Sequence, residues 1–171
     1  NESDHNTSPN TDDPNYRKFK VRQQINVGTI LDRIQDRIEK TVSDFLDCMF
    51  SQKNFPPPFV TRTLANINDL VKKSDRFSAP SFIVSRFYFR FLCAVIVTPK
   101  SFGLCGLTSD PQDLQRRGLM IISKVLQNIA NGSAFGLKES QLVPLNAFIK
   151  SRFGSVQRFI SNLSAHNVDH D

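Results

Sequence analysis

The sequence of 171 residues contains no tryptophan and only three histidines, and the positions of those histidines limit its chemistry. His5, His166 and His170 all lie in the polar ends of the chain, so residues 6–165 contain none. A Ser-His or Cys-His catalytic pair, or a set of histidine metal ligands, therefore has nothing to be built from in that region. This absence excludes most hydrolase mechanisms.

The sequence is also poor in cysteine and has no long apolar run. Cys48, Cys93 and Cys105 are odd in number and widely spaced, which favours reduced thiols over a secreted disulfide framework and argues against zinc. No apolar run reaches the roughly 18 residues that a membrane span needs, and no initiator methionine or signal peptide is visible. We therefore expect a cytoplasmic fragment of a longer protein, forming one domain without a metal or cofactor.

Charge is present in excess and is unevenly distributed. Lys and Arg number 22 against 16 Asp and Glu, which gives a net charge of +6. Residues 1–75 carry 11 basic and 11 acidic side chains, whereas residues 76–171 carry 11 basic and 5 acidic ones. This asymmetry suggests an acidic partner, which could be nucleic acid, a lipid surface or an acidic protein face. Solvated helix faces are the alternative interpretation.

The spacing of apolar residues predicts an all-α fold. Steps of three and four predict a long amphipathic helix through Val27, Ile30, Leu31, Ile34, Ile38, Val42, Phe45, Leu46 and Met49. The prolines at positions 56–58 end this helix, and a shorter one follows over residues 60–71. Residues 82–97 are apolar nearly all the way round, which predicts a helix at the centre of the core.

Several residues predict where the remaining helices begin and end. Ser78 and Asp110 are each followed closely by proline, which is typical of a helix start. Gly132 is placed to close a helix in the left-handed conformation. Two more short helices are predicted over residues 142–149 and 153–163.

The predicted domain occupies residues 16–164. Residues 1–15 contain no aliphatic or aromatic side chain apart from proline and should form a disordered polar tail. Residues 165–171 form a second polar tail. No strand pattern of useful length and no internal repeat is present.

Two arginines stand out in the most apolar segment. Arg86 and Arg90 are one helical turn apart and so share a face of the predicted core helix. Both could extend to the surface while their stems pack, and for Arg86 this reading stays open. For Arg90 it is weaker, because a cation among Phe89, Phe91 and Leu92 needs several acceptors, such as clustered backbone carbonyls.

A polar stripe runs along the helix that precedes Gly132. Its members recur at steps of three and four residues and are Arg117, Met120, Lys124, Gln127 and Asn131. A solvated face is the simpler interpretation of the pattern alone. A lysine flanked by amides, with little negative charge, suits an acidic protein loop better than duplex DNA.

Four sequence blocks resemble the Ras GTPase-activating protein family. FYFRFLCAVIVTP at residues 87–99 resembles the family signature, and RGLMIISKVLQNIAN follows at residues 117–131. FGLKE at residues 135–139 and PLNAFI at residues 144–149 come next, with wording most similar to the neurofibromin-like branch. The resemblance is specific over residues 82–160 and implies a helical RasGAP-like domain, here its C-terminal portion.

The resemblance also implies roles for individual residues. Arg90 matches the arginine that holds the loop of the catalytic arginine finger through main-chain hydrogen bonds. The residues that match the surface receiving the switch regions of Ras are Lys124, Gln127, Asn131, Lys138 and Glu139. Within that set, the acidic Glu139 is expected to position Lys124.

The sequence departs from the family pattern in two places. Ala94 and Val95 stand where the family usually has Pro-Ala, which we expect to be a local effect. The block that carries the finger arginine belongs upstream of residue 16 and is not present, so no catalytic residue is expected in this chain. RTLA at residues 62–65 imitates part of that block, but we interpret it as a decoy because it follows the proline segment.

The resulting hypothesis is a GTPase activator, not itself an enzyme, for the GTP-bound form of a Ras-type small GTPase. It would down-regulate Ras signalling, with other parts of the parent protein providing any recruitment to the inner face of the plasma membrane. One alternative is a catalytically inactive GAP-related scaffold that only binds a GTPase. The other is a helical domain attracted to nucleic acid or acidic lipid by its charge, although we expect no nucleic acid partner.

Overall fold

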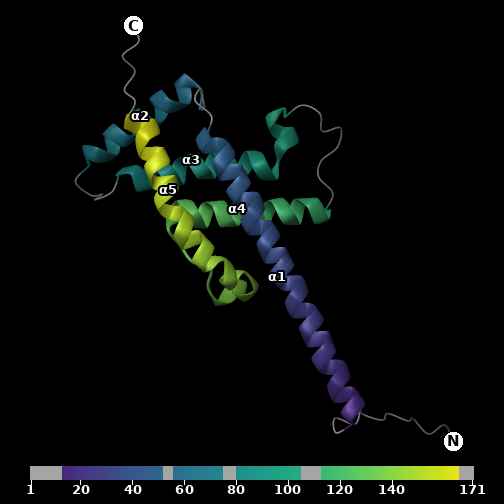
Figure 1. The fold of residues 1–171 in the computed structure, drawn as a ribbon. Coiled ribbons are helices and arrows are strands. Elements are labelled where there is room, and N and C mark those ends of the chain that lie inside the picture. The colour runs from purple at the N-terminus through teal and green to yellow at the C-terminus, as the bar shows by residue number, and fades with distance from the viewer. Residues whose placement is uncertain (1–12, 52–55, 75–79, 105–112, 166–171) are drawn as a thin grey trace, which may run out of the picture. The chain divides into compact units, whose positions relative to one another are not determined.

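The computed structural model describes residues 13–51, 56–74, 80–104 and 113–165 (Figure 1). These residues form five α-helices, two 3₁₀ helices and no strand, which confirms the all-α prediction. The α-helices are α1 (Pro14–Ser51), α2 (Pro58–Lys72), α3 (Pro80–Val97), α4 (Asp113–Asn131) and α5 (Asn146–Ala165). The 3₁₀ helices are η1 (Pro99–Phe102) and η2 (Leu137–Leu145).

The chain divides into two compact units, residues 1–37 and 38–171, with the division inside α1. In the first unit the predicted apolar stripe is exposed at Ile30, Leu31 and Ile34. In the second unit the same stripe is buried at Val42, Leu46 and Met49, which belong to the core. The amphipathic pattern therefore corresponds to burial only in the part of the helix after residue 37.

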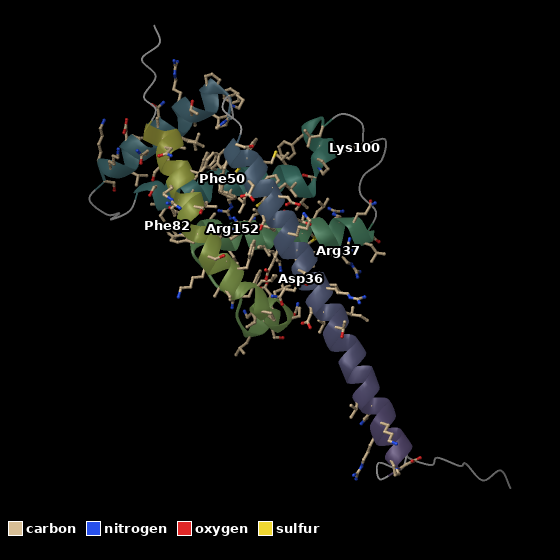
Figure 2. All side chains as sticks on the ribbon, in the orientation of Figure 1. Asp36, Arg37, Phe50, Phe82, Lys100 and Arg152 are labelled. Atoms are coloured by element: carbon tan, nitrogen blue, oxygen red, sulfur yellow. The ribbon has the colours of Figure 1, made fainter. Side chains whose placement is uncertain are left out.

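The core of the second unit lies where α3 packs against α4, with α2 and α5 also in contact with α3. Figure 1 shows α3 and α4 side by side. α5 is attached to residues 38–51 of α1 by polar and aromatic contacts. Arg152 donates to the Ser43 hydroxyl at 2.8 Å, and the rings of Phe50 and Phe159 lie 4.9 Å apart. Figure 2 labels Arg152 on α5 and Phe50 on α1.

The prediction that α3 is buried on every face is wrong for one side of the helix. Val84, Phe89 and Cys93 are buried, but Phe87 is 54% exposed and Phe91 is 60% exposed. Hydropathy reports how apolar a segment is, whereas burial also requires a neighbour on each face. In the second unit the neighbours of α3 cover the face that carries Val84 and Phe89.

The end of α4 confirms the predicted role of Gly132. Its φ is +57°, its N–H donates to the carbonyl of Ile129, and the next N–H, of Ser133, donates to the carbonyl of Asn128. These two bonds form a Schellman motif. The predicted helix starts at Ser78 and Asp110, and most of both predicted tails, lie outside the described residues.

The two short helices predicted after Gly132 need a correction. Residues 137–145 form η2, whereas residues 146–165 form the single helix α5. Pro144 lies within η2, and Asn146 is the first residue of α5. Gly154 does not interrupt α5, because the helix is stabilised by a buried face that includes Val156 and Ile160. Across the described part of the chain, no helix has the length and hydropathy needed to cross a membrane.

Candidate functional site

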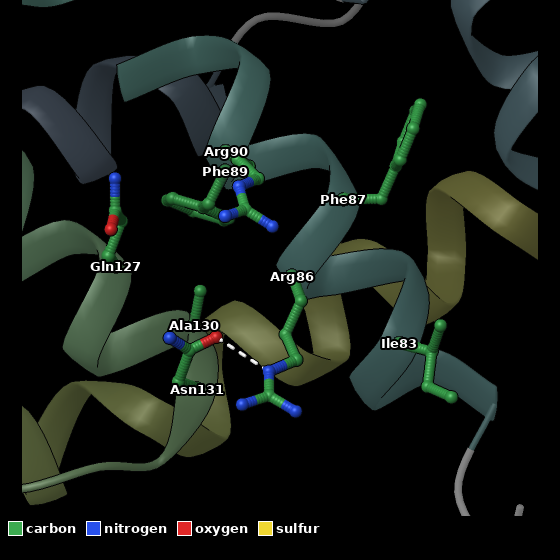
Figure 3. Close-up of a pocket in the computed structure, with 8 residues that line it drawn as sticks. All are labelled: Ile83, Arg86, Phe87, Phe89, Arg90, Gln127, Ala130 and Asn131. Carbon is green, nitrogen blue, oxygen red and sulfur yellow. Dashed lines mark hydrogen bonds between the residues drawn. The ribbon is translucent and has the colours of Figure 1, made fainter. Parts of the chain in front are cut away.

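A hollow of about 480 Å³ lies between α3 and α4 (Figure 3). Its lining residues are Ile83, Arg86, Phe87, Phe89, Arg90, Gln127, Ala130 and Asn131. Three of the predicted site residues, Arg90, Gln127 and Asn131, are thus brought together although they come from segments far apart in the sequence. The hollow is the first of two parts of the candidate site.

Two buried hydrogen bonds set how α3 and α4 are aligned at the hollow. Ser85 donates from its hydroxyl to the carbonyl of Ala130 at 3.4 Å, and Cys93 donates from its thiol to the carbonyl of Ser123 at 3.4 Å. The paired positions increase along α3 while they decrease along α4, so the two helices run antiparallel. Burial raises the pKa of the Cys93 thiol to about 11. Hydrogen bonds to Gln127 and Ser123 lower this pKa, but their effect is smaller than that of burial. Gln127 therefore links the lining of the hollow to the core.

Arg90 lies on the exposed side of α3 and lines the hollow. Its side chain reaches solvent, as in the surface reading that the sequence left open. Among the described residues, none accepts a hydrogen bond from Arg90, so its guanidinium donors face solvent. Its role as a support for the finger loop stays a prediction.

Arg86 is a further member of the site that the sequence did not assign to it. Its Nε donates to Oδ1 of Asn131 at 2.9 Å, and its guanidinium carbon lies 4.9 Å from the centre of the Phe82 ring. Its spacing of four residues from Arg90 was the available signal. The sequence does not show which helix faces Arg86, so it could not predict whether this side chain lies on an open surface or in the site.

The second part of the site joins α4 to η2 through an ion pair. Nζ of Lys124 lies 2.6 Å from Oε1 of Glu139, and the two side chains are 49% and 34% exposed. The structure thus brings together the two residues that the family resemblance relates, while the role of this pair stays a prediction. Lys138 is exposed beside Leu137, which is 96% exposed.

The turn that carries Lys138 and Glu139 is held by Asn146, a residue that the sequence analysis did not single out. The N–H of Phe135 donates to Oδ1 of Asn146 at 2.8 Å, and Nδ2 of Asn146 donates back to the carbonyl of Phe135 at 3.1 Å. The ring of Phe135 is buried in the core. This two-way contact fixes the start of the segment that presents Glu139 to Lys124.

The remaining sequence predictions have clear positions. The stripe Arg117, Met120, Lys124, Gln127 and Asn131 is exposed or partly exposed along α4, whereas Val125, Leu126 and Ile129 are buried. The segment at residues 62–65 lies on α2, where Leu64 and Ala65 are buried and Arg62 is exposed. That arrangement is typical of an ordinary amphipathic helix. Among the residues that the structure describes, no group of three His, Cys, Asp or Glu could hold a metal ion.

Comparison with known proteins supports the first two of the four blocks, at residues 87–99 and 117–131, because the matching family model ends at residue 131. A family model described as "GTPase-activator protein for Ras-like GTPase" matches residues 1–131. The human "Ras GTPase-activating protein nGAP" is 37% identical over 82 residues, which is 48% of this chain and 7% of the relative. The "Ras GTPase-activating-like protein rgaA" of Dictyostelium discoideum is 26% identical over 154 residues, 86% of this chain and 18% of the relative. The human "Disabled homolog 2-interacting protein" is 38% identical over 82 residues, 48% of this chain and 7% of the relative.

The chain therefore spans a small share of each of these relatives, and the finer similarity to the neurofibromin-like branch stays a prediction. The family match covers more than three quarters of the chain, including both helices that line the hollow as far as Asn131. The chain belongs to the RasGAP family.

Proposed function

We propose that this chain is the C-terminal portion of a domain that activates a Ras-type small GTPase. It docks the switch regions of the GTP-bound form and completes the active site of its partner, and it does not hydrolyse GTP itself. The observation that carries this proposal is the row of polar side chains on the solvent side of α4, which continues onto η2. Its members are Lys124, Gln127, Asn131, Lys138 and Glu139.

The charge of this surface supports an acidic partner. Arg90, Lys124 and Lys138 are exposed cations, and Glu139 is paired with Lys124. Complementary charge increases the rate of encounter and selects between partners. The density of cations is low for a nucleic-acid surface, which usually neutralises a row of phosphates. An acidic switch region fits better.

The state of Arg90 supports its proposed role as a support for the finger loop. Its donors have no acceptor in the described chain, and a guanidinium group can bind several carbonyl oxygens at once. We propose that these carbonyls belong to the loop of an arginine finger supplied by upstream sequence. An arginine finger contributes about 10³- to 10⁵-fold to turnover in Ras-type GTPases, so misplacement of its loop is costly.

The proposal also includes a cellular setting. The protein acts in the cytoplasm and lowers Ras signalling, and other parts of the longer protein provide any recruitment to the inner face of the plasma membrane. No cofactor of its own is required, because positioning and charge stabilisation are the contributions it makes.

Single-turnover GTP hydrolysis by a Ras-type GTPase, with the full-length protein and its Arg90→Ala variant, tests the proposal. We expect acceleration by the unmodified protein and a loss of about 10²-fold in Arg90→Ala, the size expected when a catalytic group is misplaced by about 1 Å. Arg62→Ala is the matched control, since Arg62 is an exposed arginine on α2, and it should retain full activity.

Each contrary outcome points to one alternative. Binding to the GTP-loaded partner without acceleration would identify a scaffold. No binding to any Ras-type GTPase, together with salt-sensitive binding to DNA or anionic vesicles, would refute the proposal and favour the electrostatic alternative.

A further inference from the structure

Arg86 places a second cation in the hollow, beside the proposed docking row on α4 and η2. It is exposed, and it lies one turn before Arg90 on the same helix. Its contacts to Asn131 and to the ring of Phe82 involve the Nε atom and the guanidinium carbon. The two terminal nitrogens take no part in the bond to Asn131. In Figure 3 they lie beyond Nε, at the tip of the side chain.

These contacts leave Arg86 ready to bind an anion. An arginine free in solvent loses rotamer entropy when it binds a ligand, but two contacts already restrict this side chain. The bond to Asn131 and the approach to the Phe82 ring together limit the positions that the guanidinium group can adopt. The outer pair of nitrogens then presents parallel donors, the geometry that matches the two oxygens of a carboxylate.

The charge around the hollow favours an anionic ligand. Its lining contains two guanidinium groups, those of Arg86 and Arg90, and no carboxylate. Like charges four residues apart on a helix repel each other. The carbonyl of Ala130, at the nearby end of α4, already accepts hydrogen bonds from Ser85 and Gln157. A carboxylate in the hollow would relieve the repulsion and satisfy the outer donors of Arg86.

We propose that Arg86 is a specificity-determining residue that binds the carboxylate of an Asp or Glu side chain on the docked GTPase. This inference rests on the proposed function, because it names the chemistry of one contact within that interface. It assigns the carboxylate to Arg86 and leaves Arg90 to the finger loop. GTPases that carry an acid at the matching position should bind more tightly than those that do not.

Binding of this chain to Ras loaded with a non-hydrolysable GTP analogue tests the inference. Arg86→Gln removes the charge and keeps a polar side chain, and we expect its Kd to rise about 10-fold, as for loss of one charge-assisted contact. The salt dependence of binding should become less steep in the same variant. Arg62→Gln is the matched control for loss of one exposed positive charge and should bind as the unmodified chain does. If both variants unfold at the same temperature as the unmodified chain, neither effect reflects misfolding.

The partner carboxylate can be located with a double-mutant cycle. Acid-to-amide substitutions across the switch regions of Ras are measured against both the unmodified chain and Arg86→Gln. One substitution should weaken binding to the unmodified chain about 10-fold and leave binding to Arg86→Gln unchanged. The absence of such a substitution would overturn the inference.

A third variant separates failure of this inference from failure of the proposed function. If Lys124→Ala loses binding while Arg86→Gln retains full affinity, docking stands and the role of Arg86 is refuted. If the unmodified chain binds no Ras-type GTPase, both proposals fall. A different outcome would also overturn the proposal. Sodium phosphate would raise the Tm of the unmodified chain but not that of Arg86→Gln, while Arg86→Gln would bind the GTPase with unchanged affinity. The hollow would then be a site for a free oxyanion.

Discussion

Replacement of Asn146 by alanine should destabilise the protein and disturb the proposed docking surface together. Asn146 exchanges two hydrogen bonds with the backbone of Phe135, at 2.8 and 3.1 Å, and its own side chain is partly buried. A hydrogen bond of this kind contributes about 1 kcal/mol to the free energy of unfolding. Asn146→Ala should therefore cost about 2 kcal/mol, because it removes both bonds.

The expected change in melting temperature follows from the size of the chain. For a protein of 150–250 residues, each 1 kcal/mol lowers Tm by about 2–4 °C, so Asn146→Ala should lower it by about 4–8 °C. Circular dichroism at 222 nm follows this unfolding directly, since the described residues are mostly helical. Asn66→Ala is the matched control, because Asn66 is an exposed asparagine within α2 and its replacement should change stability by less than about 0.5 kcal/mol.

The same variant should weaken binding of a GTP-loaded Ras-type GTPase. Once the turn at residues 135–139 is released, Glu139 no longer holds Lys124 in one position. Adding Glu139→Gln to Asn146→Ala should then weaken binding little further, because both changes act on the same contact.

Two results would contradict this reasoning. A Tm for Asn146→Ala within about 1 °C of Asn66→Ala would show that the two hydrogen bonds contribute nothing net. Full additivity of the two substitutions on Kd would show that Asn146 does not act through Glu139.

Three other predictions follow from single contacts. Gly132→Ala should lower the free energy of unfolding by about 1–2 kcal/mol, since φ at Gly132 is +57° and a Cβ there would lie 3.1 Å from the Phe153 ring. In Gly154→Ala, inside α5, the added Cβ meets no atom within 4 Å, so this change should be neutral or stabilising. Urea unfolding of the two variants compares their free energies of unfolding. Cys93, with its pKa raised to about 11, should resist iodoacetamide at pH 8 while exposed Cys48 reacts, and peptide mass spectrometry with and without denaturant reads both sites. The same shift contributes stability below pH 9 that is lost as the pH rises through about 11. Glu139→Gln should change the free energy of unfolding by less than about 1 kcal/mol, because its ion pair with Lys124 is partly exposed. The same variant should slow GTPase activation measurably. Equal activation by the variant and the unmodified protein would rule out the positioning role of Glu139.

The sequence predicted the parts of the fold that depend on local chemistry. Gly132 closes α4 because only glycine adopts a positive φ there without strain, and glycine is visible in the sequence. The prolines before α2 likewise mark a helix boundary that does not depend on any neighbour. Local signals of this type require no knowledge of tertiary contacts.

The parts that the sequence did not predict depend on contacts between distant segments. The carbonyl that Ser85 meets lies 45 residues away, and so does the Asn131 amide that meets Arg86. No spacing rule within one helix reveals that these two positions face each other. For the same reason the exposure of Phe87 and Phe91 could not be derived from a segment that is apolar throughout.

The arrangement of α4 makes stability and docking separable in experiments. Its buried side, with Val125, Leu126 and Ile129, belongs to the core, whereas Lys124 lies on the exposed side that we propose meets the GTPase. Substitutions of exposed residues such as Lys124 remove few buried atoms and should leave Tm nearly unchanged, while substitutions on the buried side should cost several kcal/mol. A variant at position 124 that loses both Tm and GTPase binding would show that this separation fails, and that the polar row on α4 serves the fold before it serves a partner.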